Sequence, residues 1–196
     1  MSAPRRISKA DILPFETYAA ERKERRQRMS ALKKTRRIEV GPVATFYFEN
    51  YDTMFQQIHE MLFIEKGGDA QIEDELAAYN PLIPQGSELV ATVMFEIDDP
   101  VRRKEMLYRL TRVEETVFFD IGGEKIMADP EHDIDRTTAD GKTSSVHFLH
   151  FRFTPDQIAR FRDPATPVVL GFGHENYSHM VALSADQKKV LAADFG

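Results

Sequence analysis

The chain has 196 residues, of which 42% are hydrophobic and 30% are charged, which is typical of one globular domain and excludes a disordered protein. It contains no cysteine, which excludes disulfides, thiolate zinc sites, cysteine-ligated iron–sulfur clusters and cysteine nucleophiles. The N-terminus has no apolar segment typical of a secretory signal, and no apolar run approaches the ~18 residues of a membrane span. A soluble cytoplasmic protein without membrane contact is therefore expected.

Positive charge is concentrated at the N-terminus, although the formal net charge of the whole chain is −6. Residues 1–37, the basic arm, hold 12 of the 26 lysines and arginines and 4 of the 32 acidic residues, a net charge of +8. Residues 38–196, the acidic body, hold the other 14 basic and 28 acidic residues, a net charge of −14. The sequence thus predicts a helical arm at 1–37 and an α+β globular domain at 38–196. The arm would contact either an outside polyanion or the body itself.

The basic arm is predicted to form a helix over residues 15–34, because it is rich in good helix formers. Its apolar stripe is sparse, and we expect Phe15, Ala19 and Met29 to touch the body. The arm lacks a series of aromatic residues for stacking on bases, so only weak, salt-sensitive attraction to nucleic acid is expected, without specificity. The arm residues predicted to contact a partner are Arg22, Arg25, Arg26, Lys33, Lys34, Arg36 and Arg37.

Two strands and a helix are predicted after the arm. Residues 37–41 and 43–50 are expected to be strands, and the second is rich in aromatic and β-branched residues. A helix is predicted over 53–66, where Thr53 and Gln56 have the spacing of a capping box. Two glycines directly after residue 66 end this helix.

The middle of the chain contains a second clear strand at 89–98, which has the composition of a buried strand. Pro100 is suited to the first position of a helix that extends to about residue 110. The other elements predicted here are a connector at 80–87, strands at 113–121 and 124–128 joined by a turn at Gly122-Gly123, and a polar surface loop at 129–144.

The last part of the chain repeats the order of a strand and a capped helix. Residues 146–153 are predicted to be a strand, and Thr154 and Gln157 form a capping box that opens a helix. The remaining elements are strands at 167–172 and 179–184 and a final helix opened by Ser184 and Gln187. These elements predict an α+β single domain with a mixed or mostly antiparallel sheet, helices packed on one side and a basic N-terminal helix.

Three glutamates are candidate metal ligands. Glu49 and Glu96 lie on two predicted strands, and Glu60 lies four residues after Gln56 on a polar face of the predicted helix. If these strands are neighbours, the three carboxylates converge. Together with a histidine they would suit iron, manganese or magnesium, which makes a divalent metal the candidate cofactor. The alternative is that the glutamates are solvated or paired with arginines.

Glu65 is predicted to project into the apolar arc of the helix over 53–66. An unpaired buried carboxylate is costly, so Glu65 is either a metal ligand or acid–base group, or a residue of the frayed last turn that bonds an arginine or extends into solvent. We favour the second interpretation.

The histidines give weaker signals. His147 and His150 are three residues apart on a predicted strand, so they point to opposite faces. His174 and His179 flank a predicted loop, but their spacing matches no zinc motif, and hydrogen bonding is the expected role. No P-loop, dinucleotide-binding, EF-hand or G-x-S-x-G motif is present.

Several segments occur in a recognisable order. KKTRRIEVGPVATFYFEN is followed by FQQIHEMLFIEK, AAYNPLIP and ELVATVMFEID, and later by VHFLHFRF and GHENYSHMVAL. In this order the chain resembles, over nearly its whole length, an uncharacterised bacterial family of unknown function. Genes of that family often lie beside genes of rubrerythrin-like and iron–sulfur oxidoreductase proteins, so the resemblance implies a role near peroxide or iron-linked redox metabolism. The polar positions that resemble the family are Arg37, Glu49, Asn50, Gln56, Glu60, Glu65, Asn80 and Glu96.

The leading hypothesis is a non-catalytic accessory or binding protein linked to redox metabolism. It would act through a protein partner, a homo-oligomer or a small ligand. One alternative is a metal-binding protein or metalloenzyme that uses Glu49, Glu60 and Glu96. The other is a weak nucleic-acid binder that uses the basic arm.

Overall fold

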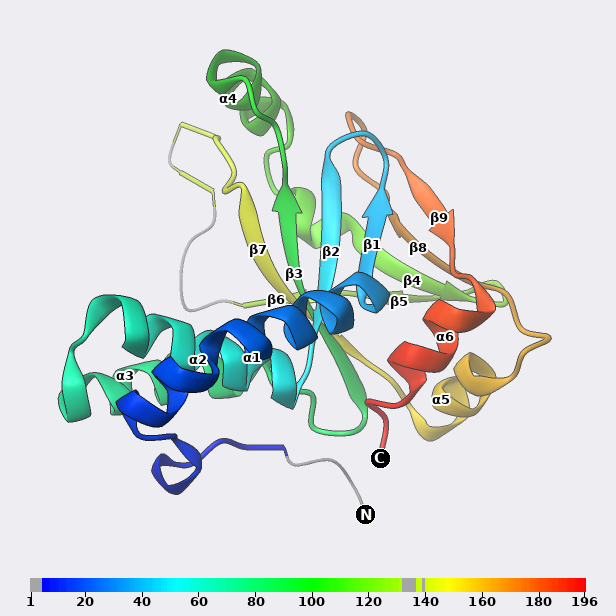
Figure 1. Ribbon diagram of the computed structural model, residues 1–196. Coiled ribbons are helices and arrows are strands. Elements are labelled where there is room, and N and C mark those ends of the chain that lie inside the picture. The colour runs from blue at the N-terminus through cyan, green and yellow to red at the C-terminus, as the bar shows by residue number, and fades with distance from the viewer. Residues whose placement is uncertain (1–4, 132–136, 139) are drawn as a thin grey trace.

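Nine strands and six α-helices in the described part of the chain form an α+β fold with two antiparallel sheets (Figure 1). The structure is a computed structural model, and it describes residues 5–131, 137, 138 and 140–196. One sheet has the order β1 (Arg37–Val40), β2 (Ala44–Glu49), β3 (Glu88–Phe95), β7 (Val146–Arg152) and β6 (Asp129–Pro130). The other has the order β5 (Glu124–Met127), β4 (Val117–Ile121), β8 (Val168–Phe172) and β9 (Met180–Ala182). The predicted α+β class is confirmed, and the strands are shared between two sheets where one sheet was expected.

The main core lies between the inner faces of the two sheets. Alternation directs Phe46 and Phe48 of β2 inward, where both are buried, and Phe151 of β7 joins them. The ring of Phe119, on β4 of the second sheet, lies 5.9 Å from that of Phe48 and 4.7 Å from that of Phe151. Such ring pairs stabilise a fold by about 0.5–1.5 kcal/mol each beyond the burial of their area. The second sheet forms because these inward aromatic side chains need a second apolar face.

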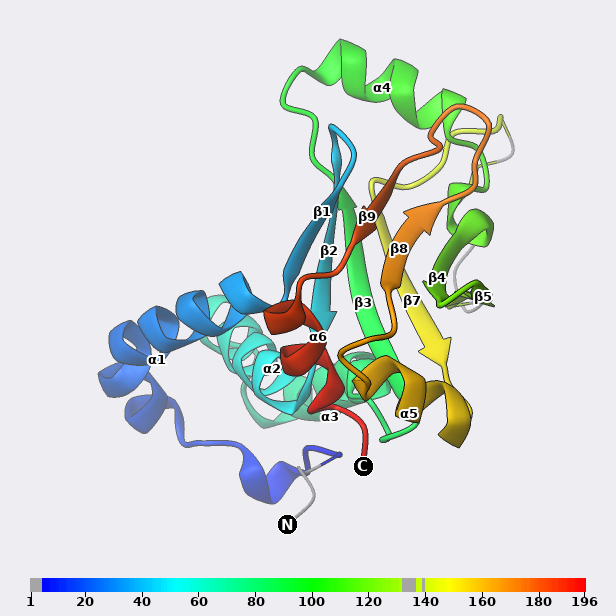
Figure 2. The same ribbon diagram turned by 90° about the vertical axis from the view of Figure 1, so that its right-hand side faces the viewer.

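Three helices lie over the outer face of the five-stranded sheet, at its lower end in the views of Figures 1 and 2. They are α1 (Phe15–Thr35), α2 (Tyr51–Glu65) and α3 (Gly68–Tyr79). A smaller apolar cluster, which includes Ile58, Leu76 and Val90, joins α2 and α3 to this face. The other helices, α4 (Pro100–Arg109), α5 (Pro155–Arg162) and α6 (Ala185–Ala192), lie toward the ends of the sheets. No helix in residues 5–131 or 140–196 is long and apolar enough to cross a membrane.

The N-terminal cap of α2 differs from the prediction. Asn50, not Thr53, is the cap residue: its side chain accepts a hydrogen bond from the backbone N–H of Thr53 at 3.0 Å. Thr53 Oγ1 in turn accepts from the N–H of Asn50 at 2.9 Å, so the helix begins at Tyr51. Asparagine competes well for this position because its short side chain reaches the helix N–H groups. Gln56 is thereby free to bond elsewhere. The predicted capping boxes at Thr154 and Ser184 are confirmed.

Other boundaries follow local backbone geometry. Residues predicted to begin a strand at 113 form the 3-10 helix η3 (Val113–Thr116), and β4 begins after it. The hairpin at Gly122-Gly123 is confirmed, with positive φ angles of 58° and 93° that glycine adopts at little cost. The expected loop at 129–144 contains β6, and its residues 132–136 and 139 lie outside the described residues. Arg37, assigned to the arm by sequence, is the first residue of β1.

A buried ion pair ties the end of the arm to the C-terminus. Arg36 is 3% exposed, and its guanidinium pairs with the carboxylate of Asp194. The same group donates from Nε to the carbonyl of Phe48 at 2.8 Å and from Nη2 to the carbonyl of Glu49 at 3.1 Å. Arg36 therefore satisfies two backbone carbonyl groups inside the fold. The sequence placed it among the residues that contact a partner, and its burial contradicts that prediction.

Substitution of Arg36 tests this tie. We expect Arg36→Met to lower the free energy of unfolding by about 3–5 kcal/mol, because it leaves the Asp194 carboxylate buried without a counter-charge. The double variant Arg36→Met/Asp194→Leu should lose less than the sum of the single variants. The matched control is Arg37→Met, since this neighbouring arginine makes an exposed pair with Glu39 worth about 0–1 kcal/mol. Urea denaturation measures the wild type and the four variants, Asp194→Leu included, and equal effects at Arg36 and Arg37 would contradict the prediction.

Candidate functional site

The basic arm lies along α2 as the antiparallel helix α1, so the predicted contact between arm and body is present. The ring of Phe15 stacks on that of Phe63 with centroids 5.3 Å apart, and farther along α1 the guanidinium of Arg25 lies 5.9 Å from the ring of Phe55. The guanidinium of Arg22 lies 4.4 Å from the ring centre of Phe63. A cation over an aromatic face is attracted to it, so arginines that interrupt the apolar stripe still help to hold the helix.

The carboxylate of Glu60, at the centre of the interface between α1 and α2, collects polar contacts from both helices. Arg22 donates to it from Nε at 3.0 Å and from Nη2 at 2.8 Å, which is a bidentate pair. The hydroxyl of Tyr18 donates to the same carboxylate at 2.6 Å and accepts from Gln56 Nε2 at 2.5 Å. Burial by itself would raise the pKa of Glu60, but the hydrogen bonds from Arg22 and Tyr18 outweigh it and lower the pKa. Burial and the bond to Glu60 raise the pKa of Tyr18.

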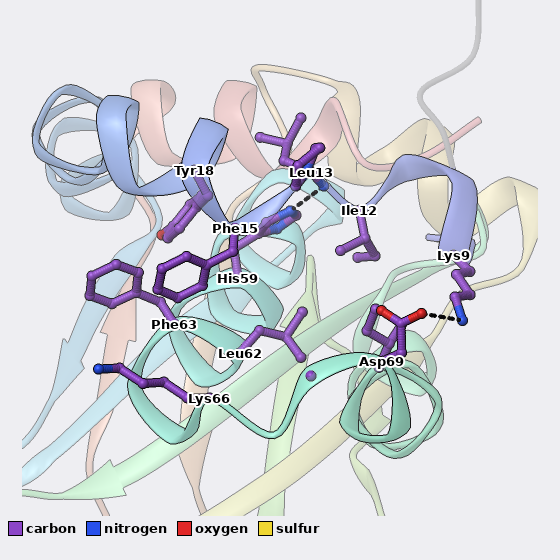
Figure 3. A pocket seen from close by; sticks show the side chains of 13 residues that line it. Lys9, Ile12, Leu13, Phe15, Tyr18, His59, Leu62, Phe63, Lys66 and Asp69 are labelled. Carbon is purple, nitrogen blue, oxygen red and sulfur yellow. Dashed lines mark hydrogen bonds and ion pairs between the residues drawn. The ribbon is translucent and has the colours of Figure 1, made fainter.

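A pocket of about 550 Å³ lies between the N-terminal segment and helices α2 and α3 (Figure 3). The segment before α1 and its first turn form one wall, and the last two turns of α2 form the other. The two stacked rings of Phe15 and Phe63 lie side by side in the view of the pocket. Its apolar lining consists of Ile12, Leu13, Pro14, Phe15, Leu62, Phe63 and Ile72.

His59 holds the wall of this pocket in place. Its Nδ1 donates to the carbonyl of Phe55 at 2.7 Å, and its Nε2 accepts from the backbone N–H of Leu13 at 3.0 Å. These two bonds require the neutral ring with the proton on Nδ1. Burial lowers the pKa of His59, which keeps the ring neutral. The pocket is therefore preformed by a hydrogen bond between residues 46 positions apart in the sequence.

Two lysines and an aspartate form the polar rim of the pocket. Lys9 lies 3.6 Å from Asp69, but their side chains are 53% and 90% exposed, so this pair is weak. Lys66 ends α2 in the left-handed conformation, with φ at 55°. Glycine usually occupies such a position, and Gly67 and Gly68 follow directly in the chain. The rim thus carries a lysine where the backbone by itself favours glycine.

The structure gives Glu49, Glu60 and Glu96 separate sets of partners. Glu49 is buried and accepts from Thr92 Oγ1 at 2.7 Å. Glu96 accepts from Thr45 and Tyr47 at 2.6 and 2.7 Å. Among the described residues, no three histidine, aspartate or glutamate side chains are grouped so that they could hold a metal ion.

Glu65 is exposed at the end of α2, as favoured by the sequence. Its carboxylate accepts a hydrogen bond from Gln71 at 2.7 Å instead of pairing with an arginine. Of the histidines, His147 is buried and His150 donates to Glu88 at 3.1 Å on the other face of β7. His174 donates to the carbonyl of Thr111 at 3.1 Å, which agrees with the hydrogen-bonding role expected for it.

The predicted partner-binding residues of the arm fall into two groups. Arg22 is bound to Glu60, and Arg25 lies 2.7 Å from Glu21 in a pair along α1. Arg26, Lys33 and Lys34 have no carboxylate within ion-pair distance among residues 5–131, 137, 138 and 140–196. Arg37 pairs with Glu39 at 2.9 Å and lies 3.7 Å from Glu96.

Sequence analysis did not identify three residues that form the pocket: Tyr18, His59 and Lys66. One local signal points to Tyr18, which follows Phe15 by three residues and so lies on the same face of the helix. The two glycines after Lys66 indicate the end of the helix, but the preference of glycine for the left-handed conformation would place that conformation at Gly67. For His59 we find no such signal, because its partner is a backbone N–H far away in the sequence.

The chain is similar to one known family and to a solved structure. The model of the family described as "Protein of unknown function (DUF3501)" matches residues 6–195. A crystal structure of a novel protein of unknown function from Burkholderia pseudomallei K96243 is 34% identical to it, with a TM-score of 0.89. That comparison covers 97% of this chain and 99% of the other chain. No curated protein gives a significant match.

Substitution of Glu60 tests the network that holds α1. At pH 7 we expect Glu60→Gln to lower the free energy of unfolding by about 1–3 kcal/mol, because the charged bonds to Arg22 are lost. The folded pKa is lowered, so this contribution is present above the unfolded pKa of about 4.3 and is lost as the pH falls through the folded value. Urea denaturation of both proteins at a series of pH values between 7 and 3 should show the difference shrink. The control is the exposed Glu65→Gln, and a pH-independent difference would contradict the prediction.

Proposed function

The chain belongs to the DUF3501 family, and we propose that it is a non-catalytic protein that binds a small amphipathic anion in the pocket beside α1. Neither the description of the family nor that of the similar crystal structure names an activity, so the proposal is based on geometry. The observation that carries it is a preformed apolar pocket with a conformationally strained lysine at its rim.

The size and lining of the pocket suit a small organic molecule. Pockets for such ligands usually enclose about 300–1,000 Å³ and are mostly apolar with a few polar groups. This one encloses about 550 Å³, and apolar side chains from the N-terminal segment face others from α2. A ring or short chain fits between these two walls. Phe15 is 46% exposed, so a ligand reaches the pocket from solvent without the helices separating.

Charge at the rim favours an anionic head group. Among the described residues, Lys9 and Lys66 line the pocket together with a single carboxylate, that of Asp69. Because the pair between Lys9 and Asp69 is exposed and weak, an incoming anion competes with it at little cost. The flexible side chain of Lys66 allows its ammonium group to follow the ligand.

The backbone conformation of Lys66 supports a role for its side chain. A residue other than glycine in the left-handed region costs about 1–2 kcal/mol, and such strain often occurs at ligand sites. Glycine at this position would remove the strain and still end α2. Lysine at position 66 is thus less favourable for folding than glycine. Binding of a ligand by its ammonium group would account for the presence of lysine here.

The buried polar groups of the pocket favour binding over catalysis. Both ring nitrogens of His59 are engaged by the backbone, and the hydroxyl of Tyr18 is bonded to Glu60. Proton transfer requires a group that exchanges its partner for the substrate. Neither side chain can do so without releasing the N-terminal segment or α1.

The remaining predictions from sequence stay predictions. The link to redox metabolism comes from the resemblance and its gene neighbours, and the partner protein or homo-oligomer and the cytoplasmic location come from sequence composition. The metalloenzyme alternative gains no support, because Glu49, Glu60 and Glu96 have separate partners.

Substitution of Lys66 separates ligand binding from folding. The probe is 8-anilinonaphthalene-1-sulfonate, which combines apolar rings with one anion. We expect one saturable site by fluorescence, and Lys66→Gly should raise its Kd about tenfold because a charged contact of about 1.4 kcal/mol is lost. The same variant should keep or gain up to about 1 kcal/mol in the free energy of unfolding, since glycine relieves the strain.

Two variants serve as controls for this experiment. Lys66→Arg keeps the charge and should keep the affinity, and Lys104→Gly removes a charge from the distant helix α4 and should not change it. A Kd unaffected by Lys66→Gly, or raised equally by the change at Lys104, would contradict the proposed site.

A further inference from the structure

We propose that a second site, the groove between the C-terminal half of α1 and the outer face of the five-stranded sheet, binds a compact phosphate-bearing anion. The groove has a volume of about 400 Å³ and is separate from the pocket, so the inference does not depend on the amphipathic ligand. Its walls carry four cations and one carboxylate. The residues that matter here are Arg26, Lys33, Lys34, Arg37 and Glu60.

Most of the positive charge in this groove is uncompensated. Glu60, the one carboxylate among the described residues of the groove, is already neutralised by the bidentate pair with Arg22. In the same part of the chain, Glu39 and Glu96 form ion pairs with Arg37 and with no other cation. Among the described residues, Arg26, Lys33 and Lys34 have no ion-pair partner. Three like charges on two turns of one helix repel one another, and a bound anion relieves this repulsion.

The spacing along α1 brings the cations to one side of the groove. Arg26 and Lys33 are seven residues apart, which places them two turns apart on the same helix face. Ser30 lies between them and also lines the groove, where its hydroxyl is an additional donor. Phosphate oxygens accept several such hydrogen bonds at once, and a bond to a charged donor is about twice as strong as one between neutral groups.

The opposite wall is formed by the sheet and by α2. The guanidinium of Arg37 lies 5.7 Å from the ring centre of Tyr47, and Gln56 and Gln57 complete the lining. Arginine held against an aromatic ring is preorganised and presents its N–H groups in a fixed plane. The groove thus has cations on two walls, which suits an anion that carries at least two charges.

The surroundings favour a compact anion over a nucleic acid. The acidic body holds 14 of the 26 basic residues and 28 of the 32 acidic residues, which gives it a net charge of −14. A long polyanion that extends out of the groove would therefore cross an acidic surface. Tyr47 is the single aromatic side chain among the described residues that line the groove, whereas binding of single strands uses several rings in series. A mono- or diphosphate ester has the size and charge that the groove accepts.

Titration calorimetry with inorganic pyrophosphate tests this site on the full chain. We expect one site whose affinity falls as salt rises, because screening weakens exposed charge contacts. In Lys33→Gln/Lys34→Gln the Kd should rise at least about tenfold. The matched control is Lys23→Gln/Arg28→Gln, which removes two charges from α1 outside the groove and should change the Kd less than about twofold.

Three results would overturn the proposal. They are no binding of pyrophosphate by the wild-type protein, equal weakening by the two double variants, and tighter binding of a single-stranded oligonucleotide than of pyrophosphate at physiological salt. Urea denaturation verifies that both variants remain folded. Binding of 8-anilinonaphthalene-1-sulfonate should be unchanged in Lys33→Gln/Lys34→Gln, so failure at one site is distinguished from failure at the other.

Discussion

The carboxylate of Glu60 holds α1 against α2, and both candidate binding regions depend on it. Tyr18 is the one residue of α1 that is buried, so burial of apolar area cannot fix the helix by itself. The bidentate contact of Glu60 with Arg22 and its hydrogen bond from the hydroxyl of Tyr18 fix the position of α1 on α2. Because these bonds are directional, they set the rotation of α1 as well as its position. That rotation directs Phe15 toward the pocket at one end and Lys33 toward the groove at the other.

The two sheets form a scaffold that is independent of these regions. Their aromatic core lies on the inner faces, while α1, α2 and α3 lie on the outer face of one sheet. The buried pair of Arg36 and Asp194 joins the end of α1 to the C-terminus, so the arm is anchored to this scaffold at a second point. Such a division allows the outer layer to vary in charge and shape while the core remains packed.

Only part of the positive charge of the basic arm forms ion pairs with the acidic body in the described chain. In the described chain, four of the arm's cations pair with carboxylates of the acidic body: Lys9 with Asp69, Arg22 with Glu60, Arg36 with Asp194, and Arg37 with Glu39 and Glu96. Several others stay free of carboxylates in the described chain and gather where α1 faces the sheet. A basic arm on an acidic body therefore produces a local positive groove within a protein of net negative charge. Such a groove concentrates small anions near the surface.

The sequence by itself determined the features that depend on near neighbours. Strand alternation, the hairpin at Gly122-Gly123 and two capping boxes were predicted because each involves residues within a few positions of one another. The division into two sheets, and the partners of His59 and Glu60, were decided by tertiary structure. Leu13 and His59 are separated by 46 positions, and Tyr18 and Glu60 by 42, so no periodicity links them. Contacts of this kind form only when packing brings distant segments together, and packing depends on all the side chains of the core at once.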